Sequence, residues 1–517
     1  MKGMGHHHPL FGGILGTDQY QLAMAQVYWR EGIADRPAQF DYFFRSYPDY
    51  GIHQAGYCVT AGLGWLLEWM ETVRFGEPDL EALRQQRGPD GHRRFDHGFI
   101  DWLGATGDFS AIEVVAVAEG RVVHANAPVA IVRGPLAMAQ ILETPFLNRM
   151  NYPTLIATKA SRVKEAAGDG LVLEFGMRRG PEDGADAGGR AALIGGCDFT
   201  SNVALSHAMG LDPKGTHAHS MVQVYMAMGG GELEAFRAFA SVYPDDCVLL
   251  VDTIDVLASG VPNAITVFEE LRADGHQPRG IRLDSGDLAY LAVQSAILLD
   301  GAGYPDVSIV LSSDLDELAI WQILSQIESE AGRYGTDPTL VISRLTYGVG
   351  TRLITSHGDS ALNGVYKLVA VAENGDWTPA IKVSESVTKI PSPGDKRVWR
   401  FYDRRGFATA DVVALAEENP TSADHHTLYH PHRNTSRTVK ADDISEMESM
   451  LTPVFNGGHP IGEPPALVTM RERRIADLER LDPGVRRLVN PHVYHVSLTE
   501  KMKELQQALV TQAIGGS

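Results

Sequence analysis

The segment Gly280-Ile281-Arg282-Leu283-Asp284 decides the fold of this chain, because its pattern recurs at a regular spacing. It is a short, β-branched apolar run that ends in an acidic residue and precedes a helical stretch. Similar runs end at Asp252, Asp314 and Gly348, so successive ends are roughly thirty residues apart, the length of one strand plus one crossover helix. The sequence therefore predicts a parallel βα array.

The predicted array fills the middle of the chain. Its expected strands are 171–175, 248–251, 280–283, 308–311 and 345–347, and its expected helices include 288–299 and 316–325. Each strand ends in small or polar residues. Because active sites of such arrays lie at the carboxyl ends of the strands, we look for function there.

The flanks of the array have a different pattern, in which helices mix with alternating strands such as 39–44 and 113–118. We therefore expect an N-terminal α+β part over 1–145, a βα-barrel domain over 146–370, and a C-terminal part over 371–517. We predict that the C-terminal part packs with the N-terminal one, so that both chain ends build a second α+β domain.

Composition narrows the class of protein. The 517 residues carry a formal net charge of −20, which argues against nucleic acid and anionic membranes as partners. The three cysteines are scattered, which fits a reducing compartment. The longest apolar runs are too short for a membrane span, and the N-terminus lacks the pattern of a signal peptide. We expect a cytoplasmic protein.

The pair His217 and His219 lies in Gly-Thr-His-Ala-His-Ser at 215–220 and has three interpretations. A metal-dependent hydrolase would use both histidines, with Asp252 and Asp284 as further ligands. A loop with one structural histidine is the plainer interpretation. The third is an imidazole that acts as a nucleophile or accepts phosphate.

Asp252, Asp284 and Asp314 end three successive expected strands, and Asp287 follows closely in Asp-Ser-Gly-Asp. Such carboxylates would hold Mg²⁺, ribose hydroxyls or a Mg²⁺-bound pyrophosphate. Alternatively, each caps the helix that follows, since aspartate is a preferred N-cap residue.

Two further segments suit phosphate binding. Glycines at 348 and 350, with Thr351 beside them, would let backbone N–H groups approach a phosphate, although a tight turn explains them as well. In Glu174–Arg179, two arginines would clamp phosphate, and Phe175 would stack on a flat ring or simply fill the core.

Taken together, these motifs resemble the nicotinate phosphoribosyltransferase family, which has type II phosphoribosyltransferase architecture. The resemblance runs in order along nearly the whole chain. Its segments include 17–22, 40–45, 56–63, 174–179, 195–202, 215–220, 252–253, 280–288, 348–353, 364–368, 490–492 and 496–498.

The resemblance implies an irregular βα barrel of α/β class and a reaction in which nicotinate takes the phosphoribosyl group of phosphoribosyl pyrophosphate. It also implies ATP as co-substrate, Mg²⁺ and a homodimer. His219 resembles the histidine that becomes phosphorylated, and the other implied catalytic residues are Asp252 and Asp284. The implied nicotinate contacts are Tyr20, Phe175, Thr216, Arg282 and Asp198. The implied phosphoribosyl pyrophosphate contacts are Arg178, Asp284, Gly348, Gly350, Thr351 and Lys367. No residue is assigned as a resident metal ligand.

Two departures from the family pattern stand out. Phe199 replaces a usual glycine, and Ser343-Arg344-Leu345-Thr346-Tyr347 lacks an expected acidic residue. Two alternatives stay open, a sister enzyme that uses nicotinamide and the metal-dependent barrel hydrolase.

Overall fold

The computed structural model of the chain describes residues 12–382 and 390–515. The chain divides into two compact units. Unit 1 consists of residues 1–155 and 361–517, and unit 2 of residues 156–360. The expected boundaries at 145 and 370 fall inside a helix (Glu143–Ala167) and a strand (Gly364–Glu373). The middle unit starts ten residues later and ends ten residues earlier than expected.

Unit 2 contains the predicted parallel array. Its six strands pair in the order β7-β6-β11-β10-β9-β8, and all five ladders are parallel. The strands are β6 (Leu171–Glu174), β7 (Phe199–Thr200), β8 (Val248–Leu250), β9 (Gly280–Leu283), β10 (Ser308–Ser312) and β11 (Leu345–Val349). This order is the chain order closed into a ring, with one ladder, between β7 and β8, missing from the described residues. The expected α/β class and irregular βα barrel are confirmed.

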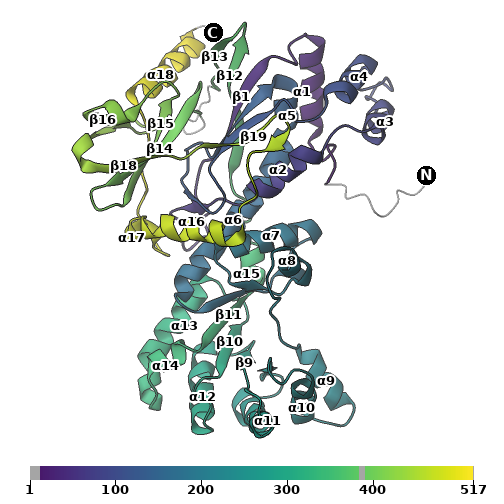
Figure 1. Cartoon of the computed structure of the whole chain (residues 1–517), viewed down its shortest axis with the longest axis vertical. Helices are drawn as coiled ribbons and strands as arrows, with labels where there is room; N and C mark the ends of the chain where they lie inside the picture. The colour runs from purple at the N-terminus through teal and green to yellow at the C-terminus, as the bar shows by residue number, and fades with distance from the viewer. Residues whose placement is uncertain (1–11, 383–389, 516–517) are drawn as a thin grey trace. The chain divides into compact units, whose positions relative to one another are not determined.

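Helices follow the strands of unit 2 as the spacing predicts. Figure 1 shows α12 beside β9 and β10, with which it is in contact. The helices are α7 (Glu182–Gly195), α8 (Val203–Ala208), α9 (His219–Ala227), α10 (Glu232–Val242), α11 (Val261–Ala273), α12 (Leu288–Gly301), α13 (Glu317–Glu330), α14 (Pro338–Ile342) and α15 (Thr351–Ile354), and the end of α6 (Glu143–Ala167) precedes β6.

A buried ion cluster holds the start of α13. The carboxylate of Glu317 lies 2.9 Å from Nζ of Lys159 and 3.2 Å from Nε of Arg162, and all three side chains are fully buried. Removing one partner would leave a buried charge without compensation, which is strongly destabilising. The cluster therefore ties the C-terminal half of α6 to the beginning of α13.

Phe199, which replaces the usual family glycine, lies in the short strand β7. Its φ is not positive, so the backbone there does not require glycine. The ammonium of Lys214 lies 5.3 Å from the centre of its ring. The substitution is therefore compatible with this backbone.

Unit 1 is built from both chain ends. Strand β1 (Pro37–Phe44) pairs with β5 (Ala130–Pro135) on one side and with β12 (Gly364–Glu373) on the other, so the N-terminal and C-terminal parts share one sheet. Its other strands are β2 (Cys58–Val59), β3 (Glu113–Ala116), β4 (Val122–Val123), β13 (Asp376–Pro379), β14 (Lys396–Asp403), β15 (Ala408–Leu415), β16 (His425–Tyr429), β17 (Ser436–Lys440), β18 (Ile444–Ser449), β19 (Thr452–Asn456), β20 (His459–Pro460) and β21 (Val496–Leu498). Its helices include α1 (Gln19–Arg30), α2 (Leu63–Thr72), α3 (Glu77–Gln85), α4 (His97–Thr106), α5 (Leu136–Ile141), α16 (Leu467–Glu479), α17 (Pro483–Arg486) and α18 (Glu500–Gly515).

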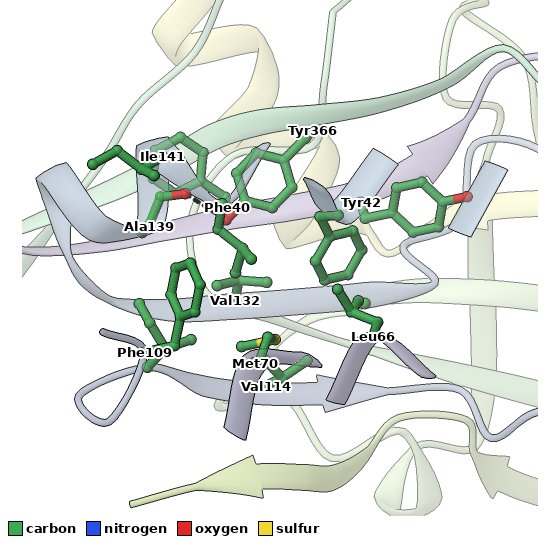
Figure 2. Packing of buried hydrophobic residues seen from close by; sticks show 14 of the residues in the cluster. Phe40, Tyr42, Leu66, Met70, Phe109, Val114, Val132, Ala139, Ile141 and Tyr366 are labelled. Atoms are coloured by element: carbon green, nitrogen blue, oxygen red, sulfur yellow. Dashed lines mark hydrogen bonds between the residues drawn. The ribbon is translucent and has the colours of Figure 1, made fainter. Parts of the chain in front are cut away.

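The core of unit 1 lies against the β1 sheet. Phe40 of β1 stacks on Tyr366 of β12 with ring centroids 4.8 Å apart. The hydroxyl of Tyr366 donates to the carbonyl oxygen of Ala139 at 2.9 Å, as the dashed line in Figure 2 marks. Stacked rings and a satisfied buried hydroxyl together fix the register of the two strands.

Within the described ranges, no helix combines the length and the apolar character that crossing a membrane requires.

Candidate active site

The carboxyl ends of β8, β9 and β10 bring together polar residues from three strands whose ends lie roughly thirty positions apart in the sequence. Asp252 follows β8, Arg282 and Asp284 lie at the end of β9, and Ser312 ends β10. The segment between β7 and β8 adds Thr216 and His219, the latter as the first residue of α9. Hydrogen bonds connect this group in two halves. The halves meet at Asp284, whose backbone N–H donates to Asp252 and whose side chain accepts from Arg282.

His219 and Asp252 form the first half of the group. Nε2 of His219 lies 3.0 Å from Oδ1 of Asp252, whose side chain is almost completely buried, while the His219 ring is about one-third exposed. Oδ2 of Asp252 accepts the hydroxyl of Ser285 at 2.6 Å and the backbone N–H of Asp284 at 3.3 Å. Both oxygens are used, so the carboxylate is fixed and orients the imidazole.

The tautomer of His219 follows from this pairing. A carboxylate accepts hydrogen bonds and has none to donate, so Nε2 must carry the proton. In the neutral ring, Nδ1 then carries the lone pair. The available nucleophilic nitrogen of His219 is Nδ1.

Arg282 organises the second half. Its Nε donates to Oγ of Ser312 at 2.9 Å, Nη1 to Oγ1 of Thr216 at 3.1 Å, and Nη2 to Oδ1 of Asp284 at 3.0 Å. Three of the five guanidinium N–H bonds are thus used. The contacts within the described chain leave one N–H on each terminal nitrogen, a fork suited to a carboxylate.

Phe175 closes one side of the group. The guanidinium carbon of Arg282 lies 5.5 Å from the centre of the Phe175 ring, within the range of a cation–π contact. The backbone N–H of Phe175 donates to the carbonyl oxygen of Val349 at 2.8 Å. A side chain at position 348 would lie 2.6 Å from the ring, so Gly348 is needed for this close approach.

The glycine-containing loop that the sequence suggested for phosphate binding lies at the end of β11. Gly350 precedes the short helix α15, where Thr351 and Arg352 are the first two residues. Nη1 of Arg352 donates to Oδ2 of Asp316 at 2.7 Å. Arg178 lies in an exposed turn after β6.

A buried carboxylate shapes that turn. Glu174, the last residue of β6, accepts the hydroxyl of Thr200 at 2.5 Å and the backbone N–H of Gly176. Burial raises the pKa of Glu174, and these two hydrogen bonds oppose the rise. Glu174 therefore holds the backbone from which Phe175 and Arg178 project.

The aspartates divide the two roles that the sequence left open. The helix caps are aspartates that lie a few residues after the strand ends. Asp255, Asp287 and Asp316 each accept backbone N–H groups at the start of a helix. Asp252 and Asp284 are instead engaged with His219 and Arg282. The capping interpretation is therefore wrong for these two.

His217 has a structural environment. Its Nε2 accepts the backbone N–H of Leu250 at 3.1 Å, and its ring packs near Phe236 and Phe239. Burial lowers the pKa of His217, so the ring is neutral near pH 7. Within the described ranges, no three His, Cys, Asp or Glu residues are grouped to hold a metal ion. A site that uses His217 and His219 as paired ligands does not fit this geometry.

Three residues of the predicted site take no part in this group of hydrogen bonds. Asp198 lies near the start of β6, where it accepts the backbone N–H of Val172 at 2.8 Å and pairs with Lys164 at 3.2 Å. Tyr20 and Lys367 belong to unit 1, where Tyr20 is half-exposed and Nζ of Lys367 lies 3.9 Å from Glu143. Their roles stay predictions.

Sequence reasoning did not assign a role in the candidate site to Ser285 and Ser312, which join the hydrogen-bonded group, or to Glu174, which shapes the turn beside it. Ser285 comes shortly after β9, Ser312 is the last residue of β10, and Glu174 is the last residue of β6. Their positions at strand ends were the available signal, but serine and glutamate are common in turns.

The chain is similar to known proteins over most of its length. Residues 15–151 match the profile of the nicotinate phosphoribosyltransferase (NAPRTase) N-terminal domain, and residues 395–506 match that of the nicotinate phosphoribosyltransferase C-terminal domain. The Bacillus subtilis nicotinate phosphoribosyltransferase is 38% identical, over 94% of this chain and 93% of its own length.

Solved structures give the same picture. The human nicotinic acid phosphoribosyltransferase structure has a TM-score of 0.77 at 29% identity, and the match covers 95% of this chain and 99% of the human one. A nicotinate-nucleotide pyrophosphorylase from Pyrococcus furiosus shares the fold, with a TM-score of 0.65 at 20% identity over 93% of this chain and 99% of its own. The chain belongs to the nicotinate phosphoribosyltransferase family.

Proposed function

We propose that the chain transfers the phosphoribosyl group of phosphoribosyl pyrophosphate to nicotinate, in a reaction assisted by ATP through a phosphohistidine at His219. The products are nicotinate mononucleotide and pyrophosphate, in the biosynthesis of NAD. The observation that carries the proposal is the hydrogen-bonded group of His219, Asp252, Arg282 and Asp284 at one end of the βα array. Membership of the family supports the reaction class.

Recognition of nicotinate rests on Arg282. Nicotinate is a flat molecule that carries a negative charge on its carboxylate. The guanidinium of Arg282 offers its two remaining N–H groups beside the ring of Phe175. A guanidinium group only donates hydrogen bonds, so the two oxygens of a carboxylate can accept both N–H groups. The amide of nicotinamide has only one oxygen, and its NH₂ group would face another donor. This geometry favours nicotinate over nicotinamide.

In the transfer step, the ring nitrogen of nicotinate forms a bond to the anomeric carbon of the ribose, and the bond from that carbon to pyrophosphate breaks. Positive charge builds on the ribose as pyrophosphate departs. The carboxylate of Asp284 is held at the site by Ser312 and Arg282 and would stabilise that charge without reorganising. Gly350, Thr351 and Arg178 are the candidates for holding the phosphates.

The ATP-dependent step uses Nδ1 of His219. Its lone pair attacks the γ-phosphorus of ATP, the nitrogen–phosphorus bond forms, and the bond to the ADP oxygen breaks. Nε2–H stays hydrogen-bonded to Asp252, which stabilises the ring throughout. The phosphate adds about −1.5 to −2 charges next to the site, by analogy with other phosphorylated side chains.

Mg²⁺ is the proposed cofactor, and the donor set fits an ion that arrives with its substrate. Mg²⁺ usually binds one or two carboxylates together with substrate phosphates. Asp284 uses Oδ1 for its contacts with Ser312 and Arg282, so Oδ2 is the oxygen available for such an ion. When bound, Mg²⁺ would supply charge neutralisation on the departing pyrophosphate.

The test is mass spectrometry of the product formed by the purified protein from nicotinate, phosphoribosyl pyrophosphate, Mg²⁺ and ATP. Nicotinate mononucleotide supports the proposal, and its absence, or faster conversion of nicotinamide in a parallel reaction, overturns it. The expected homodimer is checked by light scattering on the same preparation.

A further inference from the structure

Ser312 ends β10 and is almost completely buried, yet its hydroxyl has three polar neighbours. Oγ accepts Nε–H of Arg282 at 2.9 Å, and it lies 2.5 Å from Oδ1 of Asp284 and 3.3 Å from the carbonyl oxygen of Leu283. A hydroxyl has one proton to donate. The charged oxygen at the shorter distance receives it, so Ser312 accepts from Arg282 and donates to Asp284.

The two charged partners of Ser312 are also close to each other. Arg282 and Asp284 are two positions apart at the end of β9, so their side chains leave the same face of the strand. Nη2 of Arg282 already donates to Oδ1 of Asp284 at 3.0 Å. With nothing between them, such a pair favours the two-bond arrangement in which Nε and Nη2 meet both carboxylate oxygens.

Ser312 blocks that arrangement. Its hydroxyl occupies the Nε position, so the carboxylate keeps a single contact with the guanidinium. Arg282 then retains the orientation in which Nη1 reaches Thr216 at 3.1 Å and the ring of Phe175 lies beside it. Asp284 keeps its second oxygen away from Arg282.

We infer that Ser312 is a positioning residue, which keeps Arg282 from pairing fully with Asp284 and so holds it ready for the carboxylate of nicotinate. This inference rests on the proposed function. Loss of the hydroxyl lets Arg282 and Asp284 close into a two-bond pair, which neutralises the guanidinium and turns its free N–H bonds away from the substrate.

The test compares three variants at this position with a matched control. Ser312→Ala removes the hydroxyl, Ser312→Thr keeps it, and Ser312→Cys keeps the size with a weak donor. The control is Ser308→Ala, at the other end of the same strand, where Oγ donates to the carbonyl oxygen of Arg279 at 2.9 Å. Each variant is measured for KM and kcat with nicotinate, nicotinamide and ATP, for Kd of nicotinate by calorimetry, and for Tm.

For Ser312→Ala we expect KM and Kd for nicotinate to rise about tenfold, the size of one lost hydrogen bond to a charged group. The preference for nicotinate over nicotinamide falls with them, whereas KM for ATP changes less than about twofold. Ser312→Thr restores the affinity, and Ser312→Cys lies between the two.

The inference is overturned if Ser312→Ala matches Ser308→Ala in nicotinate affinity, or if affinity for ATP and nicotinate falls equally with Tm. If Ser312→Ala does not fold, the contrast between the Thr and Cys variants decides. A wild-type protein that makes no product from nicotinate overturns the proposed function instead, so the two failures are distinguishable.

Discussion

Nη1 of Arg352 donates to Oδ2 of Asp316 at 2.7 Å, which links the beginning of α15 to the beginning of α13. The other oxygen of Asp316 caps α13 by accepting the backbone N–H groups of Leu318 and Ala319. One carboxylate thus serves two structures through separate oxygens. Since Arg352 follows Thr351 directly, this ion pair steadies the loop proposed to bind phosphate.

Asp316→Asn separates the two roles, because the amide oxygen retains the cap while the ion pair is lost. We expect KM for phosphoribosyl pyrophosphate to rise by about threefold to tenfold, in line with a partly buried charged hydrogen bond, and Tm to change little. Steady-state kinetics measure this. Asp337→Asn is the control, since Asp337 caps α14 in the same way. Equal kinetics for the two variants would contradict the role of the ion pair.

Substitutions at His219 and Asp252 should selectively reduce the stimulation of synthesis by ATP. His219→Ala should abolish ATP stimulation while slow synthesis without ATP persists, because the phosphate acceptor is gone and the substrate contacts remain. Asp252→Asn should reduce stimulation at least about tenfold, because an amide no longer holds Nε2 as the protonated nitrogen. Incorporation of γ-phosphate from labelled ATP into the protein is the second readout. The control is His276→Ala, which removes a comparable histidine–aspartate pair with Asp245 at 3.0 Å and should not change the stimulation by ATP. Normal stimulation by ATP in His219→Ala would refute the phosphohistidine.

Arg282→Lys preserves the charge but not the planar fork that reaches Ser312, Thr216 and Asp284. We expect the Kd for nicotinate to increase on the order of a hundredfold, because lysine cannot make the two-bond contact with a carboxylate. ATP affinity should stay within about twofold. Calorimetric titration of each ligand checks this, with Arg279→Lys as the control outside the site. Equal losses for nicotinate and ATP would count against direct contact.

Gly348→Ala tests the packing beneath the ring of Phe175. The new methyl group would lie 2.6 Å from two ring carbons, so the ring must move or the strand must shift. We expect the free energy of unfolding to fall by about 1–3 kcal/mol, as for other overpacked sites, and nicotinate affinity to fall with it. Urea denaturation and calorimetry measure both. Gly332→Ala, with open space around it, should leave both unchanged.

His124 predicts the acid sensitivity of unit 1. The ring is fully buried, stacks on Tyr494 at 3.5 Å and bonds to the hydroxyl of Tyr47 at 2.9 Å. Burial lowers the pKa of His124 from 6.5 to about 3. Because the folded pKa lies below the unfolded one, stability is complete above pH 6.5 and is lost as the pH falls from there toward 3.

The size of this effect follows from the two pKa values. Between pH 7 and pH 5, His124 alone should cost about 2 kcal/mol of unfolding free energy. Denaturation curves at the two pH values measure the loss in the wild type. The variant His124→Gln, which cannot titrate, should lose about 2 kcal/mol less over that interval, and an equal loss in both proteins would exclude His124 as the source.

Local pattern predicted the βα array well, because a buried parallel strand must be apolar and a crossover helix has a minimum length. The range 280–283 agrees with β9 at both ends, and the helix expected at 288–299 is α12 with two further residues. The two-residue strand β7 escaped prediction, because Phe199 and Thr200 form no apolar run. It exists through its pairing with β6, a contact that no local pattern contains.

Within the site, the sequence by itself determined which strand ends carry carboxylates, arginine and glycines, since those residues are read directly. Only the tertiary structure decided which partners these residues contact. Asp252 and Asp255 are equally good caps in isolation, and His217 and His219 share one loop. His217 packs beside Phe236, whereas the hydrogen bond to Asp252 joins His219 to the candidate site. Such contacts depend on distances between residues that are remote along the chain, and those distances are set by how the strands pair.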